Sequence, residues 1–224
     1  MISLKKVVDP NRSEFDILME EGKKILSKNP MEALRYFKRS LAEAPDSNSV
    51  INALRMIGIS NCSMGYFVES KENLDLAKEI LFKSGSLKTH IAALLDRDFG
   101  NLYLTIGCLT QAHNSFLESY NLFSELGDKH EADTSWGFVG RAKFLRCDPE
   151  GKYSIARAHR RLKGSKYELD NLIWLLRSSV RPRFRHTVRA LALAIKPNQV
   201  RYAISKILVI FFGGNRLYRR FFKN

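Results

Sequence analysis

Residues 96–107 read DRDFGNLYLTIG, and they place a glycine directly after a large apolar residue within a helical pattern of apolar side chains. The same arrangement recurs at Ile57-Gly58 and at Val139-Gly140. Glycine inside a helix costs about 1 kcal/mol relative to alanine, so it usually marks the close approach of a neighbouring helix. We therefore expect Gly58, Gly100 and Gly140 to lie where helices pack against one another.

Second amphipathic segments alternate with these glycine-containing helices. Residues 69–82 follow the predicted helix that contains Gly58, and residues 109–128 follow the one that contains Gly100. Nearer the N-terminus, residues 29–45 (NPMEALRYFKRSLAEAP) carry Ala33, Phe37 and Ser40 at helical spacing and end at Pro45. This alternation predicts a series of helical hairpins, and hence an all-α fold.

The spacing resembles that of the tetratricopeptide repeat (TPR) family, over about residues 14–160. One repeat fits well, with the expected residue types at Phe99, Gly100, Tyr103, Ala112 and Phe116. The other three repeats are partial: the first has two glutamates at residues 20–21 where Leu-Gly is expected, and the fourth loses the pattern after residues 146–152. The glycines are about 40 residues apart, which is similar to the long-helix variant of the family. The resemblance implies a TPR-like helical-hairpin solenoid, and an unrelated helical bundle is the alternative.

Proline residues divide the remainder into three further helical segments. The first carries a stripe of Leu169, Leu172, Ile173 and Leu176, and we expect it to cap the last repeat. The other two span residues 183–195 and 197–212. The predicted organisation is therefore an N-terminal arm at 1–13, a repeat domain at 14–163, a helical capping region at 164–196, and a basic amphipathic helix and tail at 197–224.

The net charge of +14 is concentrated at the C-terminal end. Residues 150–224 contain 18 lysines and arginines but only Glu150, Glu168 and Asp170 as acidic residues. Such a field favours anionic lipid, nucleic acid or an acidic protein as partner. The alternative is a solvated basic surface that serves solubility.

The sequence predicts membrane contact for the C-terminal tail, ILVIFFGGNRLYRRFFKN at residues 207–224. Its apolar run is too short to cross a bilayer and suits a helix that lies in the interface, with basic and aromatic residues at the headgroups. The residues expected to touch lipid are Ile207, Leu208, Phe211, Phe212, Arg216, Tyr218, Arg219, Arg220, Phe221, Phe222 and Lys223. Docking on the repeats or on a partner helix, and nucleic-acid binding, are the alternatives. The tail also weakly resembles the C-terminal ends of some membrane-associated glycosyltransferases.

No motif for catalysis or for a cofactor occurs in the sequence. The five histidines are scattered without metal-ligand spacing, and neither a phosphate-binding loop nor a nucleophile elbow is present. The three cysteines, Cys62, Cys108 and Cys147, fit no disulfide or zinc framework, which indicates a reducing compartment. We expect a non-enzymatic protein without cofactor, metal or small-molecule substrate, located in the cytoplasm and peripherally at the cytoplasmic membrane face.

The TPR resemblance further implies that the first helices of successive repeats line a groove for a partner peptide or helix. Arg97 with Asn101 is similar to the pair with which some members hold a C-terminal carboxylate, but Phe138 stands where the next asparagine of that clamp is expected. The resemblance therefore implies an acidic partner more generally, unless the arginines pair with Asp96, Asp98 or Glu118. The predicted groove residues are Asn52, Arg55, Ile59, Arg97, Asn101, Leu104, Thr134 and Arg141.

These observations predict a protein-interaction scaffold that binds a partner in a TPR groove and attaches to anionic membrane through its C-terminus. One alternative is an accessory subunit of a membrane-associated glycosyltransferase or surface-polysaccharide system. Another is a TPR regulator associated with nucleic acid.

Overall fold

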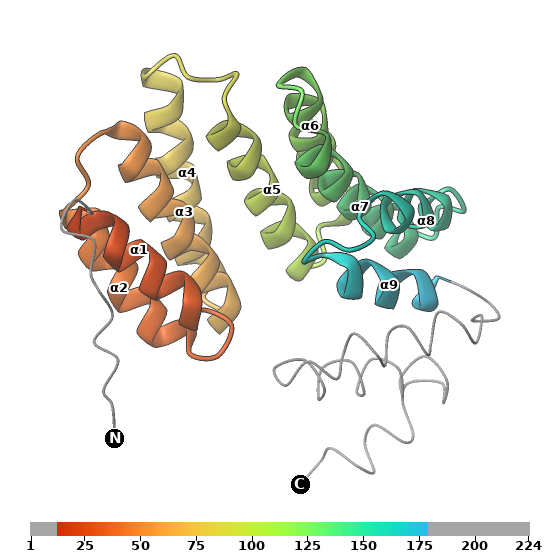
Figure 1. Cartoon of the computed structure of the whole chain (residues 1–224), viewed down its shortest axis with the longest axis horizontal. Coiled ribbons are helices and arrows are strands. Elements are labelled where there is room, and N and C mark those ends of the chain that lie inside the picture. The colour runs from red at the N-terminus through yellow and green to blue at the C-terminus, as the bar shows by residue number, and fades with distance from the viewer. Residues whose placement is uncertain (1–12, 179–224) are drawn as a thin grey trace, which may run out of the picture. The chain divides into compact units, whose positions relative to one another are not determined.

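The computed structural model describes residues 13–178, and these form helices joined by short turns (Figure 1). No strand occurs in this part of the chain. The predicted N-terminal arm, the segments at 183–195 and 197–212, and every predicted membrane-contact residue lie outside the described residues. The chain divides into two compact units, which meet in sequence between Cys108 and Leu109.

The first unit contains helices α1 to α5. Their bounds are Glu14–Ile25 (α1), Pro30–Ala42 (α2), Ser47–Met64 (α3), Phe67–Lys83 (α4) and His90–Thr105 (α5). Helix α1 packs on α2 and α3 packs on α4, while α2 contacts α3 and α5 contacts both α3 and α4. The hairpins α1–α2 and α3–α4 therefore match the alternation that the sequence pattern predicted for this part of the chain.

Side-chain caps mark where the first three of these helices begin. Ser13, Asn29 and Asp46 precede α1, α2 and α3, and each side chain accepts a hydrogen bond from the backbone N–H three residues later. Such caps satisfy backbone donors that the first turn of a helix leaves without partners. A shared apolar core then holds the first three helices together, with residues Phe15, Met19, Ala33, Phe37, Ala53, Met56 and Ile57.

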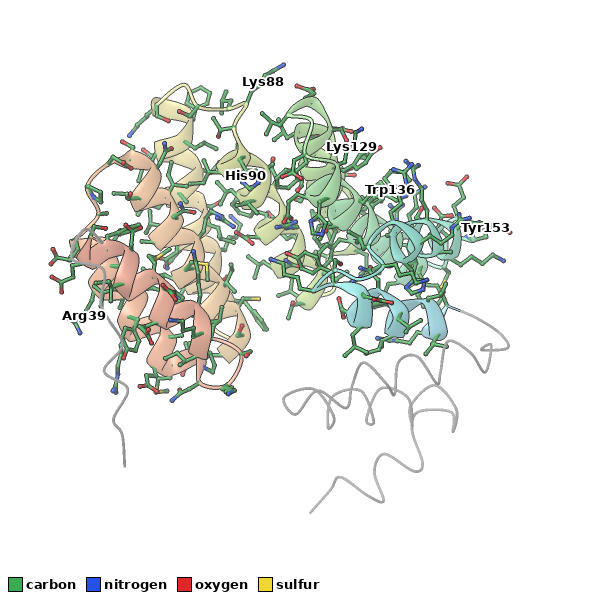
Figure 2. The ribbon with its side chains drawn as sticks, in the orientation of Figure 1. Arg39, Lys88, His90, Lys129, Trp136 and Tyr153 are labelled. Carbon is green, nitrogen blue, oxygen red and sulfur yellow. The ribbon has the colours of Figure 1, made fainter. Side chains whose placement is uncertain are left out.

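The second unit contains α6 (Leu109–Glu125), α7 (Lys129–Leu145), α8 (Gly151–Arg161) and α9 (Glu168–Arg177). Helix α7 packs against both α6 and α8, and α9 packs against α8. The apolar stripe of α9, at Leu169, Leu172, Ile173 and Leu176, is buried. On α8 the side of Ile155 and Ala158 is fully buried, whereas Tyr153 projects outwards (Figure 2).

Two of the glycines singled out in the sequence lie at close helix contacts. A Cβ atom added to Gly58 would lie 2.9 Å from Leu74 Cδ2 on α4, and one added to Gly140 would lie 2.8 Å from the backbone nitrogen of Ile155 on α8. In α1 this role falls to Gly22, whose added Cβ would meet the ring of Phe37. The close approach of α1 and α2 thus depends on Gly22, which directly follows the two glutamates at residues 20–21.

Candidate functional site

The first unit contains a buried ion pair between α3 and α5. Arg55 Nε and Nη2 each lie 2.7 Å from Asp98 Oδ2, and Arg55 Nη1 donates a hydrogen bond of 3.0 Å to Asn52 Oδ1. The side chains of Arg55 and Asp98 are each only 7% exposed. The guanidinium is therefore held by groups of the protein itself and is not presented to a ligand.

The electrostatics of this pair are dominated by its burial. Burial raises the pKa of Asp98, and the positive charges of Arg55 and Arg97 act in the opposite direction. Removing a carboxylate from water disfavours its charged form, and a nearby cation offsets that cost. Arg55 thus stabilises the first unit by pairing with the buried Asp98 carboxylate.

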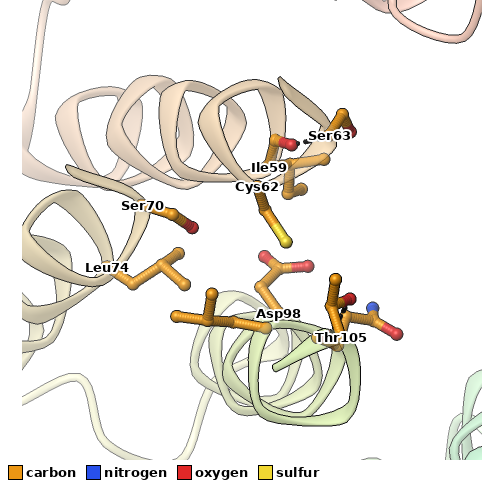
Figure 3. Close-up of a pocket in the computed structure, with 9 residues that line it drawn as sticks. Ile59, Cys62, Ser63, Ser70, Leu74, Asp98 and Thr105 are labelled. Atoms are coloured by element: carbon orange, nitrogen blue, oxygen red, sulfur yellow. Dashed lines mark hydrogen bonds between the residues drawn. The ribbon is translucent and has the colours of Figure 1, made fainter. Parts of the chain in front are cut away.

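A pocket of about 380 Å³ opens beside this ion pair (Figure 3). Cys62 of α3 and Asp98 of α5 face each other across it, and Leu74 of α4 forms part of its apolar wall. The lining residues are Ile59, Cys62, Ser63, Ser70, Leu74, Asp98, Asn101, Leu102 and Thr105. Ligand sites of proteins typically combine apolar walls with a few polar groups in this way.

All three hydroxyl groups that line the pocket donate to backbone carbonyls. Ser70 Oγ donates to Gly58 O at 2.8 Å, and Thr105 Oγ1 donates to Asn101 O at 2.8 Å. The side-chain amide of Asn101, by contrast, has no hydrogen-bond partner among the described residues and is partly exposed. An amide offers both donors and an acceptor, so Asn101 can bind the backbone of an incoming peptide through two hydrogen bonds.

Cys62 contributes a thiol to the pocket that is poorly suited to nucleophilic chemistry. Burial raises the pKa of Cys62, and the effect of the Thr105 hydroxyl, which lowers it, is smaller. Because the thiolate is the reactive form, a raised pKa reduces the reactive fraction at neutral pH. The pocket is therefore a better binding site than a catalytic one.

This environment gives a prediction for thiol modification. In a short pulse of iodoacetamide at pH 7.5, we expect Cys62 to react about tenfold more slowly than Cys147, which is exposed. The difference should narrow as the pH rises, because more of Cys62 becomes thiolate. Mass spectrometry of proteolytic peptides measures both rates, and equal rates at pH 7.5 would contradict the described environment of Cys62.

The two predicted groove residues on α7 are also engaged within their own unit. Thr134 Oγ1 donates to His130 O at 2.9 Å. Arg141 Nη2 lies 2.6 Å from Asp170 Oδ2 and 3.1 Å from Asn171 Oδ1, both on α9, and its guanidinium lies 4.3 Å from the Phe138 ring centroid. Helix α9 thus holds the charge of Arg141, so this arginine has a structural role within the second unit.

The predicted groove residues therefore fall into distinct groups. Asn52 and Arg55 join the buried ion pair, Ile59 and Asn101 line the pocket, Leu104 is partly buried, and Arg97 is buried. Sequence reasoning missed the contributions of Cys62 and Thr105 to the pocket. The sequence did contain a signal for both residues. Cys62 follows Ile59 by three positions and Thr105 follows Asn101 by four, so each shares a helical face with a predicted groove residue.

The described part of the chain contains no cluster of metal ligands and no helix suited to span a membrane. Between residues 13 and 178, no three His, Cys, Asp or Glu side chains cluster in a way that could hold a metal ion. In the same range, no helix combines the length and the apolar character needed to cross a membrane.

Comparison with known proteins identifies the fold. No protein-family profile matches the sequence, and no curated protein matches it. The structure is similar to that of a protein from Podospora anserina assigned as a kinesin light chain with nearly identical TPR-like repeats, at a TM-score of 0.57 and 12% sequence identity. The similarity covers 90% of this chain and 97% of that one. The prediction of an all-α, TPR-like helical-repeat fold is thereby confirmed.

Proposed function

We propose that this protein is a non-catalytic interaction scaffold, and that its first unit binds an extended segment of a partner protein across α3 and α5. The single observation that carries this proposal is the pocket at the C-terminal ends of these helices, with the Asn101 amide at its edge. In the proposed complex, Asn101 binds the partner backbone, and a partner side chain enters the pocket next to Cys62.

The chemistry of the pocket favours an uncharged side chain as its occupant. Ile59, Leu74 and Leu102 supply apolar surface, while the Arg55 charge is already balanced by Asp98. An acidic side chain would be repelled by the nearby Asp98 carboxylate, and Arg55 is already paired with that carboxylate. A neutral residue of moderate size, such as leucine or methionine, gains from burial without this cost.

Peptide selection against the full chain tests this function. Selected peptides are expected to lose about tenfold or more in affinity to the Asn101→Ala variant, because two hydrogen bonds to the peptide backbone are removed. Fluorescence anisotropy of labelled peptides measures the dissociation constants. The Cys62→Leu variant, which fills part of the pocket, should cause a similar loss.

A matched asparagine provides the control for this experiment. Asn121 is exposed on α6, outside the first unit, so Asn121→Ala should change the affinity less than twofold. A library that yields no binding peptide, or peptides equally affected by both asparagine variants, would refute the proposed site.

Peripheral attachment to an anionic membrane remains part of the proposal on the strength of the sequence. Its support is the excess of positive charge with apolar and aromatic residues in the C-terminal segment. Flotation with anionic liposomes, comparing the full chain with a chain that ends at Pro197, tests it. Equal flotation of the two chains would remove the tail as the attachment site, and with it the expected location at the cytoplasmic membrane face.

The two alternative functions depend on the same C-terminal segment. An accessory role beside a glycosyltransferase rests on the weak resemblance of the tail alone. A nucleic-acid role rests on its positive charge alone. No feature of the described residues favours either alternative over the interaction scaffold.

A further inference from the structure

A positively charged surface lies on α8 and the turn that follows it. Between Glu150 and Glu168 there are six lysines and arginines and no acidic residue. We define this set as the basic face: Lys152, Arg157, Arg160, Arg161, Lys163 and Lys166. Helical spacing brings Tyr153, Arg157 and Arg160 to the same side of α8, and the buried Ile155 and Ala158 occupy the other side.

The flanking carboxylates do not neutralise this surface. Glu150 Oε2 lies 2.7 Å from Lys143 Nζ on α7. Glu168 is 3% exposed and accepts a hydrogen bond of 2.6 Å from the backbone N–H of Gly164. Arg161 pairs with Asp133 at 3.0 Å, and it is the one member of the basic face with a carboxylate partner among residues 13–178.

Aromatic rings, rather than carboxylates, position three of the remaining cations. Lys152 Nζ lies 4.9 Å from the ring centroid of Tyr153, Arg157 Cζ lies 5.3 Å from that of Trp136, and Lys166 Nζ lies 4.8 Å from that of Tyr167. A cation held over an aromatic face keeps its full charge. The basic face is thus ordered and positively charged at the same time.

From this arrangement we propose that the basic face binds a carboxylate-rich segment of a protein. Helix α8 has 11 residues and is about 16 Å long, so an extended acidic segment of about five residues spans it. Carboxylates of such a segment replace the missing counter-charges of Arg157, Arg160 and Lys163 without disturbing the aromatic contacts. This site is independent of the pocket in the first unit.

The same observations argue against other polyanions as the main occupant. Single-stranded nucleic acid gains much of its affinity from bases that stack on aromatic rings. Here Tyr153, Trp136 and Tyr167 each already carry a cation over the ring. A membrane surface would need exposed apolar side chains to insert, and on α8 Tyr153 is the one large hydrophobic side chain that is exposed, at 65%.

The test uses the full chain and a fluorescently labelled peptide of ten glutamates at about 50 mM salt, where exposed charges are weakly screened. The triple variant Lys152→Gln, Arg160→Gln, Lys163→Gln should raise the dissociation constant about five- to tenfold. These three side chains are exposed, so the fold should be retained, and circular dichroism checks this.

A triple variant in the first unit serves as the control, because it replaces two lysines and one arginine by glutamine, as the α8 variant does. Lys28, Arg35 and Lys38 are likewise exposed, and replacing all three by glutamine removes the same charge from the chain. This control should change the dissociation constant by less than twofold. Equal losses in both triple variants, or no loss in the α8 variant, would overturn the proposal.

Two further probes distinguish the class of partner. A ten-nucleotide thymidine oligomer and vesicles that contain phosphatidylserine are titrated with the same variants. A carboxylate-specific site predicts that the α8 substitutions affect the glutamate peptide most. A larger loss for the oligonucleotide or for the vesicles would overturn the assignment to an acidic protein segment.

Discussion

Replacement of Arg55 by methionine should lower the free energy of unfolding by about 3–5 kcal/mol at pH 7, because it leaves the buried Asp98 carboxylate without its counter-ion. Urea denaturation followed by circular dichroism measures this loss. Arg39→Met is the control, since Arg39 forms an exposed pair with Glu14 at 3.4 Å. Exposed pairs contribute about 0–1 kcal/mol, so this control should have little effect.

The Arg55→Met variant should also respond to pH in a defined direction. Burial already raises the pKa of Asp98, and removal of Arg55 raises it further. A carboxyl group whose folded-state pKa exceeds its unfolded value destabilises the fold as the pH rises through the folded-state pKa. The free energy of unfolding of the variant should therefore be closest to that of the natural protein at acidic pH, and it should fall as the pH rises towards neutral.

A second substitution separates the lost counter-ion from lost packing. The double variant Arg55→Met, Asp98→Leu removes both charges of the buried ion pair, and apolar residues that replace a buried ion pair are often tolerated. Most of the lost stability should return, and the unusual pH dependence should disappear. A double variant as unstable as Arg55→Met alone would show that the ion pair is not the source of the effect.

Replacement of Gly151 by alanine should destabilise the second unit by about 3 kcal/mol, the upper end for an overpacked site. The added Cβ would meet the Phe144 backbone, with Phe144 Cα at 2.7 Å, and would lie 2.8 Å from Gly140 O. Backbone atoms cannot move aside as a flexible side chain does, so α7 and α8 must separate. Thermal denaturation measures the loss, and hydrogen exchange should place it in these two helices.

Gly65 provides the control for an alanine substitution without crowding. It has a φ of 85°, and an added Cβ would meet no atom within 4 Å. Gly65→Ala should therefore cost only the strain of a left-handed residue, about 1–2 kcal/mol. Equal losses for the two glycine variants would contradict the close contact of α7 and α8.

The helical hairpins could be predicted from the sequence because their signals are local. Apolar side chains at helical spacing and glycines after large residues are visible within 15 residues, and Gly58 and Gly140 do lie at helix contacts. Helix α8 was harder to predict, since the family pattern ends at residues 146–152. It packs through Gly151, Ser154 and Ala158, and small residues carry little periodic signal.

The pocket and the ion pair could not be predicted in detail because they combine residues that are distant in sequence. Arg55 and Asp98 are 43 positions apart, and the sequence left Asp96, Asp98 and Glu118 open as partners. Only the packing of α3 on α5 selects Asp98. The basic face, in contrast, is visible as a run of charge, but the rings that order it are contributed in part by α7 through Trp136.

The most direct test of the central claim is the rate at which iodoacetamide alkylates Cys62 in the presence of a selected peptide. We predict that a saturating peptide slows the alkylation of Cys62 at least tenfold, because the peptide side chain occupies the pocket that this thiol lines. The rate at the exposed Cys147 should change less than twofold. An unchanged rate at Cys62 with the peptide fully bound would show that the partner segment binds elsewhere.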